Sequence, residues 1–247
     1  VTWDFQEMLD AVHQRVFTVA GILKVDALEA IRESLVRAME EGMPYKAWVK
    51  TIVPELEKRG LLGRHKLVNP ETGELKTLTP WRLRTIYQTN LQSAFMAGRY
   101  AQMQAATESH PYWQYVAILD GRTRPSHRAM NGKVFRYDDP FWGSFYPPNG
   151  WGCRCRVVAL SEDNLTKGGI KADSSSGKLG STMKLVSEKT GEMREVATYR
   201  ATDPATRREI VFSPDVGWSY NPGAAAWQPD PKRYTGDLAN LAKKELP

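Results

Sequence analysis

The stretch from Thr79 to Ser109 constrains the fold of this chain more than any other, because Gly98 is the only helix breaker after Pro80. Thr79 can cap a helix and Pro80 suits a first turn, so the sequence predicts one long helix that begins here. The expected core face of this helix consists of Trp81, Ile86, Leu91, Phe95 and Met103. The same stretch also carries arginine, glutamine and asparagine side chains, so a packed scaffold helix and a partner-binding helix both remain open.

Shorter helices are predicted before the long one. Residues 4–42 have apolar side chains at spacings of three and four, which predicts two helices. Asp26 is expected to cap the second of them, with the glutamate three residues later completing a capping box. Another helix is expected from Pro44, and Pro54 either ends it or begins a further short helix. Residues 66–78 then predict a small hairpin.

From His110 onward, β-branched and aromatic residues replace the helical pattern. Three segments have the composition of strands: residues 112–119, residues 133–137 and residues 153–160. A short helix is expected after the first of these segments, with Thr123 as its cap and Pro125 in its first turn. Residues 138–152 are rich in proline, glycine and aromatic side chains, so we expect a long loop there.

The C-terminal part is less regular. Residues 172–181 have the composition of a linker, and residues 182–201 predict a β-hairpin that turns at residues 189–191. The chain beyond it is extended, apart from a short helix expected near the end. Its aromatic side chains either dock on another protein or pack against the chain's own domain, and they are Trp218, Tyr220, Trp227 and Tyr234.

Together these patterns predict an α+β protein in three parts. Residues 1–109 are expected to form a helical region with one long helix. Residues 110–171 are expected to form a small mixed α/β module, and residues 172–247 an irregular extension with a linker, a β-hairpin and an interaction tail.

Composition limits the classes of protein that remain. The chain has 247 residues and a net charge of +6, which favours an anionic partner, although a solvated basic surface explains the charge equally well. No apolar run approaches the about 20 residues needed to cross a bilayer, and we see no secretory signal, so we expect no membrane partner. The first residue is Val1, so we expect further residues to precede it. Two cysteines do not make a disulfide framework, so we expect a reducing compartment.

Both cysteines lie in one Cys-Arg-Cys tripeptide, and this raises the question of a metal site. Asp120, His127, Cys153 and Cys155 are the candidate ligands, because thiolates, an imidazole and a carboxylate suit tetrahedral zinc. A strand–helix–strand unit can bring these residues together. Their spacing, however, matches neither a zinc finger nor a zinc-dependent deaminase.

Two other interpretations of the same residues stay open. One is nucleophilic catalysis by a cysteine, with His127 as base and Asp120 as the orienting carboxylate. The other, which we favour, is a structural polar clamp that holds residues 140–152 onto the sheet. The clamp residues are Asp120, Arg122, Thr123, Ser126, His127 and Arg154. A clamp is compatible with a bound metal ion.

A larger set of positions carries a resemblance to a known family. These positions are residues 82–99, the set Asp120, Arg122, Thr123 and His127, residues 132–135, and residues 147–156. Together they resemble the phage Mu protein F-like family, the head-morphogenesis minor head proteins of tailed phages. Residues 217–223 also resemble the downstream region of its closer members. This sequence departs from the family pattern at Gln88, where a basic residue is common in the family.

The resemblance implies a virion component that is made in the cytoplasm of a bacterial host and lies in the phage head, at the portal vertex or in the interior. It implies a role in head assembly, with the portal protein or the major capsid protein as partner and double-stranded DNA as a further partner of some members. No catalytic activity defines the family, so we expect no enzyme, no small-molecule substrate and no cofactor apart from a structural zinc ion. The alternatives are a DNA-binding module for packaging or ejection, and an enzyme centred on His127 and the cysteines.

Overall fold

The computed structural model describes residues 17–225, except residues 18, 63–66, 70, 74, 77, 189 and 203–205. The helix predicted at the C-terminus and most of the first helix predicted within residues 4–42 therefore lie outside the described residues. The end of that first helix is wrong, because residues 19–24 are not helical. Among the described residues, no helix is long and apolar enough to cross a membrane.

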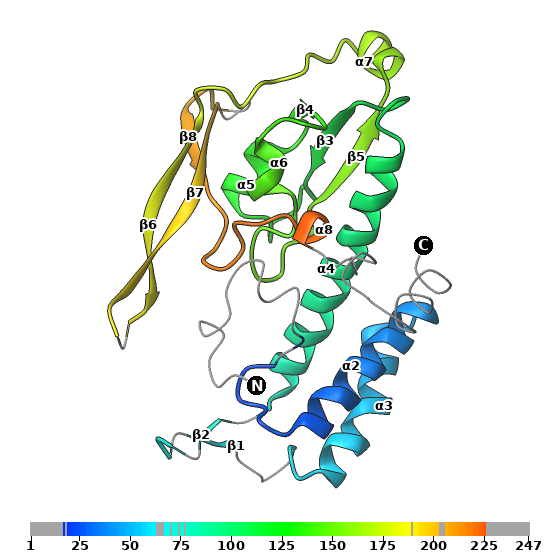
Figure 1. Ribbon diagram of the computed structural model, residues 1–247, viewed down its shortest axis with the longest axis vertical. Coiled ribbons are helices and arrows are strands. Elements are labelled where there is room, and N and C mark those ends of the chain that lie inside the picture. Colours follow the sequence, from blue (N-terminus) through cyan, green and yellow to red (C-terminus); the bar gives the residue numbers. More distant parts are fainter. Residues whose placement is uncertain are drawn as a thin grey trace, which may run out of the picture.

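Within the described residues, three helices build the N-terminal part (Figure 1), namely α2 (Val25–Glu40), α3 (Tyr45–Lys58) and α4 (Pro80–Ala105). Helices α2 and α3 pack against each other and against the first half of α4. The centre of their core is Trp48, which is fully buried and donates a hydrogen bond from Nε1 to Ser34 Oγ over 3.0 Å. The predicted helical region is confirmed for the part of it that the structure describes.

Two details of these helices differ from the prediction. The capping box at Asp26 is wrong: α2 begins at Val25, so Asp26 lies inside the first turn, where its charge still favours the positive end of the helix. Pro54 neither ends nor begins a helix, because it lies inside α3. Ile52 and Leu56 are both buried on either side of Pro54, and their packing holds the helix together there.

The long helix begins as predicted, since the side chain of Thr79 accepts a hydrogen bond from the backbone N–H of Arg82. The small hairpin before it is also present, as β1 (Leu67–Val68) and β2 (Leu75–Lys76). The predicted core face of α4 is partly wrong, because Trp81 and Phe95 are 72% and 55% exposed. The helix crosses from one core to another, so its buried face is not one straight stripe.

The central module is a three-stranded antiparallel sheet with short helices around it. Its strands are β3 (Tyr112–Val116), β4 (Val134–Arg136) and β5 (Arg156–Leu160), in the order β4-β3-β5. Its helices are α5 (Pro125–Met130), α6 (Phe141–Phe145) and α7 (Glu162–Gly168). The predicted loop thus contains a helix, α6, and the third strand begins after both cysteines rather than at Cys153.

A second three-stranded antiparallel sheet follows, built from β6 (Leu179–Ser187), β7 (Glu192–Thr202) and β8 (Glu209–Phe212). The predicted hairpin is confirmed, but β6 begins within the predicted linker. The β6–β7 hairpin projects from the body of the molecule (Figure 1). The chain then returns across the module to α8 (Pro222–Ala225), which packs against α4.

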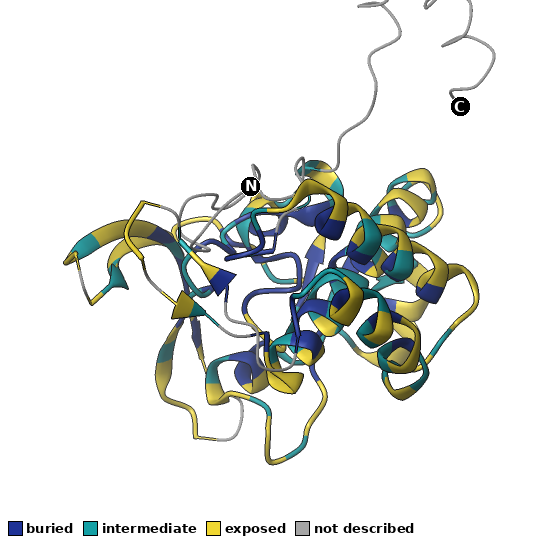
Figure 2. Cartoon of the chain, turned by 90° about the horizontal axis from the view of Figure 1, so that it is seen from below, coloured by how far each residue is buried: buried dark blue, intermediate teal, exposed yellow. Residues whose placement is uncertain are grey.

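A dense aromatic core joins the two sheets. Phe135 of β4 stacks on Phe141 of α6 with ring centroids 4.3 Å apart, and Tyr199 of β7 meets both rings edge-on. Phe212 of β8 is fully buried in the same core. Buried residues gather between the elements, whereas the projecting hairpin is largely exposed (Figure 2). The predicted α+β class is confirmed, and the domain boundaries at residues 109/110 and 171/172 stay predictions.

Phe135, which is fully buried, and Phe95, which is 55% exposed, provide a matched test of this core. Phe135→Ala is expected to lower the free energy of unfolding by about 3–5 kcal/mol, because it empties a fully buried aromatic site. Phe95→Ala is expected to change it by less than about 1 kcal/mol, because that ring is half-exposed on a helix surface. Urea titration measures both values. Equal losses for the two variants would contradict the described core.

Candidate metal centre and polar clamp

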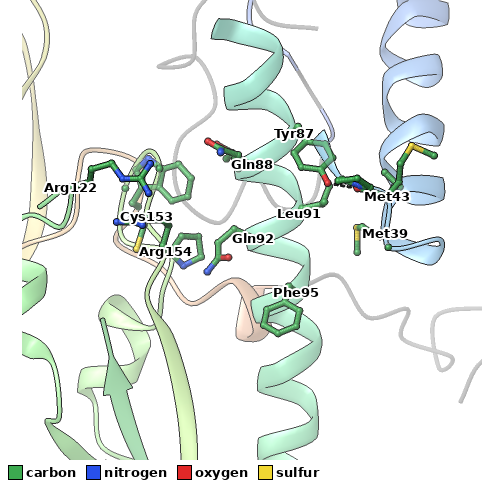
Figure 3. Close-up of a pocket in the computed structure, with 18 residues that line it drawn as sticks. Met39, Met43, Tyr87, Gln88, Leu91, Gln92, Phe95, Arg122, Cys153 and Arg154 are labelled. Carbon is green, nitrogen blue, oxygen red and sulfur yellow. Dashed lines mark hydrogen bonds between the residues drawn. The ribbon is translucent and has the colours of Figure 1, made fainter. Parts of the chain in front are cut away.

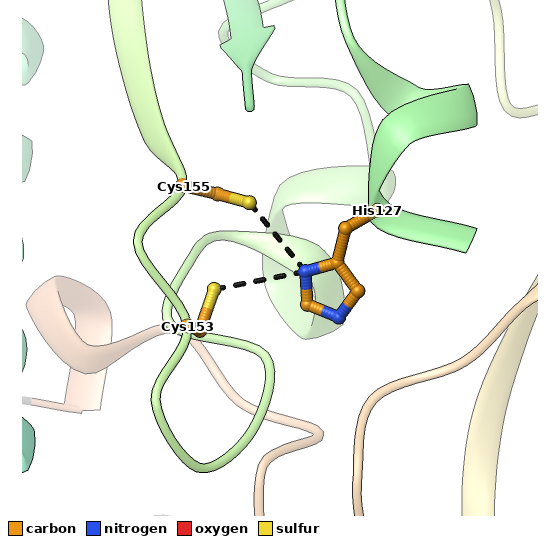
Figure 4. A group of neighbouring side chains, drawn as sticks. All are labelled: His127, Cys153 and Cys155. Atoms are coloured by element: carbon orange, nitrogen blue, oxygen red, sulfur yellow. Dashed lines mark hydrogen bonds between the residues drawn. The ribbon is translucent and has the colours of Figure 1, made fainter. Parts of the chain in front are cut away.

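Three potential metal ligands converge at one point in the module (Figure 4). His127 Nδ1 lies 3.4 Å from Cys155 Sγ and 3.7 Å from Cys153 Sγ. The three ligand atoms all lie within 4.8 Å of one another. His127 comes from helix α5, and the cysteines come from the segment that leads into β5. The sequence predicted that a strand–helix–strand unit brings these three residues together with Asp120. The geometry is consistent with this prediction for His127 and the two cysteines.

Local sequence explains why the cysteine segment takes this path. Gly150 has a φ of +155°, which side chains rarely permit. A Cβ atom at Gly150 would also collide with the carboxylate of Asp215 and the guanidinium of Arg124. The backbone N–H of Cys153 then donates to the carbonyl of Gly150 over 3.2 Å, which closes the turn before the first cysteine. A glycine is therefore required where the loop passes beneath this ion pair.

The long helix holds the second cysteine in place. Gln92 Nε2 of α4 donates a hydrogen bond of 2.9 Å to the carbonyl of Cys155. About two helical turns further along α4, Arg99 Nε donates to the carbonyl of Val157. These side chains satisfy strand carbonyls that face the helix, so α4 fixes the position of the Cys-Arg-Cys segment. This gives the polar residues of α4 a scaffold function within the chain.

The imidazole of His127 is 4% exposed and is enclosed on its other sides. Its Nε2 faces Arg124 Nη1 at 3.5 Å, and Phe212 packs edge-on against the ring with centroids 5.4 Å apart. Arg124 in turn pairs with Asp215 over 3.0 Å and donates to the carbonyl of Trp151 over 3.0 Å. The ring is thus held so that Nδ1 points at the two sulfur atoms.

The pKa values of the two thiols are shifted in opposite directions. The pKa of Cys153 falls well below its usual range, because it accepts a hydrogen bond from Cys155 and is further stabilised by His127. The pKa of Cys155 rises, because its proton is shared with Cys153 and the group is buried. Burial together with these two sulfurs also raises the pKa of Tyr115. Of the two sulfurs, Cys153 therefore has the greater tendency to lose its proton, and the thiolate is the form that binds metal ions or attacks electrophiles.

A bidentate ion pair lies beside the cluster. Arg154 donates from Nη1 and Nη2 to the two carboxylate oxygens of Asp120, over 2.8 and 2.6 Å. The backbone N–H of Arg122 and the hydroxyl of Thr123 also donate to Asp120, over 3.0 and 3.2 Å. These donors, with Arg154 contributing most, lower the pKa of Asp120 far below its usual range. Conversely, Asp120 raises the pKa of Arg154.

The structure corrects several sequence assignments at this site. Asp120 does not join the converging ligand atoms, because both of its oxygens bind Arg154, so its role as a metal ligand stays a prediction that this geometry does not favour. Thr123 is not a helix cap, because its hydroxyl donates to Ile118 and Asp120 and the cap position falls to Arg124.

The predicted clamp is smaller than expected. Its core is Asp120, Thr123 and Arg154. Arg122 joins mainly through its backbone, since its side chain is 82% exposed and 3.6 Å from the carboxylate. Within the described residues, the side chain of Ser126 makes no hydrogen bond to the clamp. His127 faces the cysteines rather than Asp120.

The nucleophilic alternative lacks its third member in the described part of the chain. The outer nitrogen of His127 faces Arg124, and a guanidinium cannot act as the carboxylate that orients a catalytic imidazole. Asp120, which was expected there, is engaged by Arg154. The geometry therefore favours a structural or metal-binding arrangement of His127 and the cysteines.

Sequence reasoning missed Asp215 altogether. Its backbone N–H donates to the carbonyl of Asn149 over 3.0 Å, so the C-terminal segment closes over the cysteine loop. No local pattern signals this contact, because Asp215 lies far along the chain in an irregular segment. The requirement for Gly150 beneath Asp215 is visible only in three dimensions.

The aromatic tail behaves differently in its two halves. Trp218 and Tyr220 are 3% and 8% exposed, and Trp218 packs edge-on against Trp151 with centroids 5.2 Å apart. Of the two arrangements open from the sequence, the described half of the tail therefore packs against its own chain. Trp227 and Tyr234, also predicted for partner binding, lie outside the described residues.

Two hollows adjoin the site. A cavity of about 150 Å³ lies beside the cluster and is lined by His127, both cysteines and arginine side chains. A wider groove of about 760 Å³ crosses the middle of α4, from Met39 and Met43 at the end of α2 to the Cys153–Arg154 segment (Figure 3). Tyr87, Leu91 and Phe95 provide much of its apolar lining.

The fold and the site define the class of protein. It is an α+β protein in which a His–Cys cluster and an Arg–Asp clamp secure a loop of the central module. A family profile described as "Phage Mu protein F like protein" matches residues 29–158, which is more than half of the chain. The chain belongs to this family, as the sequence resemblance predicted. The matched range includes the cluster and the clamp but not Asp215 or the second sheet.

Two relatives extend the similarity beyond that range. The chain is 42% identical to "Putative capsid assembly protein F" of Escherichia phage Mu over 232 residues, 93% of the chain and 52% of that protein. It is 40% identical to "Mu-like prophage FluMu F protein" of Haemophilus influenzae (strain ATCC 51907 / DSM 11121 / KW20 / Rd), over 93% of the chain and 55% of that protein. The chain thus spans about half the length of the curated relatives it matches. No solved structure matches it significantly.

The clamp makes a prediction about the pH dependence of stability. Because the folded pKa of Asp120 is depressed, its contribution is fully present above the unfolded pKa of about 3.9 and is lost as pH falls through the folded value. Asp120→Asn should therefore lower the urea midpoint at pH 7, and its difference from the wild type should shrink steadily below about pH 4.

Arg136 and Asp138 offer a matched control, since both side chains of that ion pair are more than half exposed. Asp138→Asn should leave the urea midpoint nearly unchanged at pH 7 and at pH 3, as expected for an exposed ion pair. A difference between Asp120→Asn and the wild type that stays constant from pH 7 to pH 3 would contradict the assigned role of the carboxylate.

Proposed function

We propose that this chain is a minor structural protein of a tailed-phage head and acts in head assembly, at or near the portal vertex or in the head interior. The observation that carries the proposal is the 42% identity to a protein named as a putative capsid assembly protein, which extends over 93% of the chain. On this proposal the protein is made in the cytoplasm of a bacterial host and becomes part of the virion. Its role is to bind other proteins, and it is not an enzyme.

The architecture supports a role as a rigid connector. Helix α4 has 26 residues, a length of about 39 Å, and it takes part in both hydrophobic cores. Leu83 and Ile86 belong to the core of the helical part, whereas Met96 and Met103 belong to the core of the module. Because both ends of the helix are anchored, partners bound to the two parts are held at a defined separation.

The projecting β6–β7 hairpin supplies an exposed apolar face for such a partner. Met183 and Leu185 lie on the same face of β6, since they are two residues apart, and Leu185 pairs with Met193 of β7. These side chains are 45–55% exposed. Contiguous exposed apolar side chains are typical of protein interaction sites. We propose the portal protein or the major capsid protein as the partner.

The hairpin can be tested with variants that leave the core unchanged. Met183→Ser combined with Leu185→Ser should weaken binding to the partner about tenfold, a loss of about 1.4 kcal/mol. Leu119→Ser is the control, because Leu119 is 62% exposed in a loop of the module, away from the hairpin. Binding is measured by pull-down with purified portal and major capsid proteins, and assembly by electron microscopy of heads from a phage that carries each variant.

Several outcomes would contradict this proposal. If a phage that lacks the gene makes infectious particles in normal number, the chain has no role in head assembly. If the chain is absent from purified mature particles, it is not a virion component. If the hairpin variant binds and assembles like the wild type, the partner surface lies elsewhere on the chain.

A second candidate function is engagement of double-stranded DNA during packaging or ejection. The net charge is +6, and exposed arginines gather at the end of β3. Arg128 donates to the backbone carbonyl of Asp120, and Arg156 pairs in the sheet with Val116. Within the described residues neither side chain forms an ion pair, so both guanidinium groups are available for phosphate contacts.

DNA binding would have a distinct salt signature. If this surface contacts phosphates, Arg128→Gln combined with Arg156→Gln should reduce the slope of log K against log salt by about 2, because each contact contributes about 0.9. Arg32→Gln combined with Arg37→Gln, at exposed positions of α2, should leave the slope unchanged. Fluorescence anisotropy with duplex DNA measures both. No detectable binding at low salt would end the DNA hypothesis without affecting the head-assembly proposal.

A further inference from the structure

We propose that His127, Cys153 and Cys155 bind one zinc ion, with His127 Nδ1 and the two Sγ atoms as protein ligands and a solvent molecule from the adjoining cavity as the fourth. This site goes beyond the head-assembly function and does not depend on it. Three features support zinc binding here: the distances between the ligand atoms, their chemistry and the free volume beside them.

The distances between the ligand atoms match those of a tetrahedral zinc site. Zinc–sulfur bonds of about 2.3 Å and zinc–nitrogen bonds of about 2.05 Å, at the tetrahedral angle, place sulfur and nitrogen about 3.6 Å apart. The observed separations of His127 Nδ1 from Cys155 Sγ and Cys153 Sγ are 3.4 and 3.7 Å, one on each side of that value. The same bond lengths place the two sulfurs about 3.8 Å apart. All three atoms lie within 4.8 Å of one another, so an ion can enter between them with a movement of about 1 Å or less.

A zinc ion joins both sulfurs to the same nitrogen more directly than hydrogen bonds do. Nδ1 of His127 carries at most one proton, which can point at only one sulfur in a linear hydrogen bond. A divalent ion interacts with all three atoms at once. Two thiolates also neutralise its charge, and thiolate with imidazole is a donor set that zinc prefers over harder cations.

The alternation of an extended chain explains why a Cys-Arg-Cys sequence forms this site. Side chains two residues apart in an extended segment point to the same side, and the one between them points away. Cys153 and Cys155 thus both face His127, while Arg154 faces Asp120 on the other side. The ion pair holds the middle residue outward, and this keeps the two sulfurs together.

The fourth position has both space and surroundings for a solvent ligand. The cavity of about 150 Å³ adjoins all three ligands. A water molecule needs much less room, about 30 Å³. Asp120 is unable to take this position while Arg154 holds both of its oxygens. The structure therefore assigns three protein ligands, not the set of four that the sequence suggested.

Zinc binding changes the protonation of the cluster. Both thiols bind as thiolates, so the proton of Cys155 is released to solvent. The imidazole binds through unprotonated Nδ1, so a neutral ring carries its proton on Nε2. Arg124 Nη1, which lies 3.5 Å from Nε2, is itself a donor and must turn away from this N–H toward Asp215. The bound ion would then join α5 to the segment before β5, beneath the strap of chain that carries Asp215.

The test is metal analysis of the full chain purified under reducing conditions without chelators. We expect about one zinc per chain, and the metal-free protein should take up Co²⁺ with the thiolate charge-transfer and tetrahedral d–d absorption bands of a sulfur-ligated site. Cys153→Ser, Cys155→Ser and His127→Gln should each lose most of the metal and the thiolate bands. His110→Gln should retain both, since His110 lies at the end of α4, away from the cluster.

Asp120→Asn and Arg154→Gln together separate the proposed ligand set from the four-residue alternative. Both variants remove the ion pair that orients the tripeptide, so they should lower the metal content by the same amount. Loss of metal in Asp120→Asn but not in Arg154→Gln, with unchanged circular dichroism spectra, would overturn the three-ligand assignment. Less than about a tenth of an equivalent of zinc in the wild type, with no cobalt bands after reconstitution, would overturn the site itself. A mass two hydrogens lower under non-reducing conditions, with no metal, would identify a Cys153–Cys155 disulfide instead, and this would also overturn the proposal.

Discussion

The pairing of Arg154 with Asp120 is the interaction on which the site depends. It joins the end of β3 to the segment before β5, and it directs the middle residue of Cys-Arg-Cys away from the cysteines. The geometry is bidentate and is supported by the backbone of Arg122 and the hydroxyl of Thr123, which makes it stronger than an ordinary surface ion pair. Gln92 of α4 holds the same tripeptide through the carbonyl of Cys155, so the ion pair and the helix position it together.

The long helix α4 organises the molecule at a larger scale. It connects two hydrophobic cores, and its polar side chains Gln92 and Arg99 bind carbonyls of the segment that carries Cys155 and Val157. Two of the polar residues that made this helix ambiguous in the sequence, Gln92 and Arg99, therefore have partners within the chain. They act as scaffold residues, whereas Trp81 and Phe95 lie exposed on the surface of the helix.

Local chemistry explains which features were predictable. The cap at Thr79, the strands of the module and the β6–β7 hairpin follow from side-chain preferences of neighbouring residues, and they were found. The convergence of His127 with Cys153 and Cys155 was also expected, because one strand–helix–strand unit contains all three. Asp215 was not found, because its contact with Asn149 joins distant segments through a backbone hydrogen bond that leaves no pattern in either one. Asp120 was expected beside the cysteines because its residue type fits a metal ligand and an arginine partner equally well.

The course of the chain after β8 has a mechanical consequence. The β6–β7–β8 sheet is followed directly by the strap at Asp215, which pairs with Arg124 and bonds to the loop at Asn149. Phe212, at the end of β8, packs against the ring of His127. The hairpin and the His–Cys cluster are therefore joined by the short stretch from Phe212 to Asp215. Any displacement of the hairpin would be transmitted along this stretch to the cysteine loop.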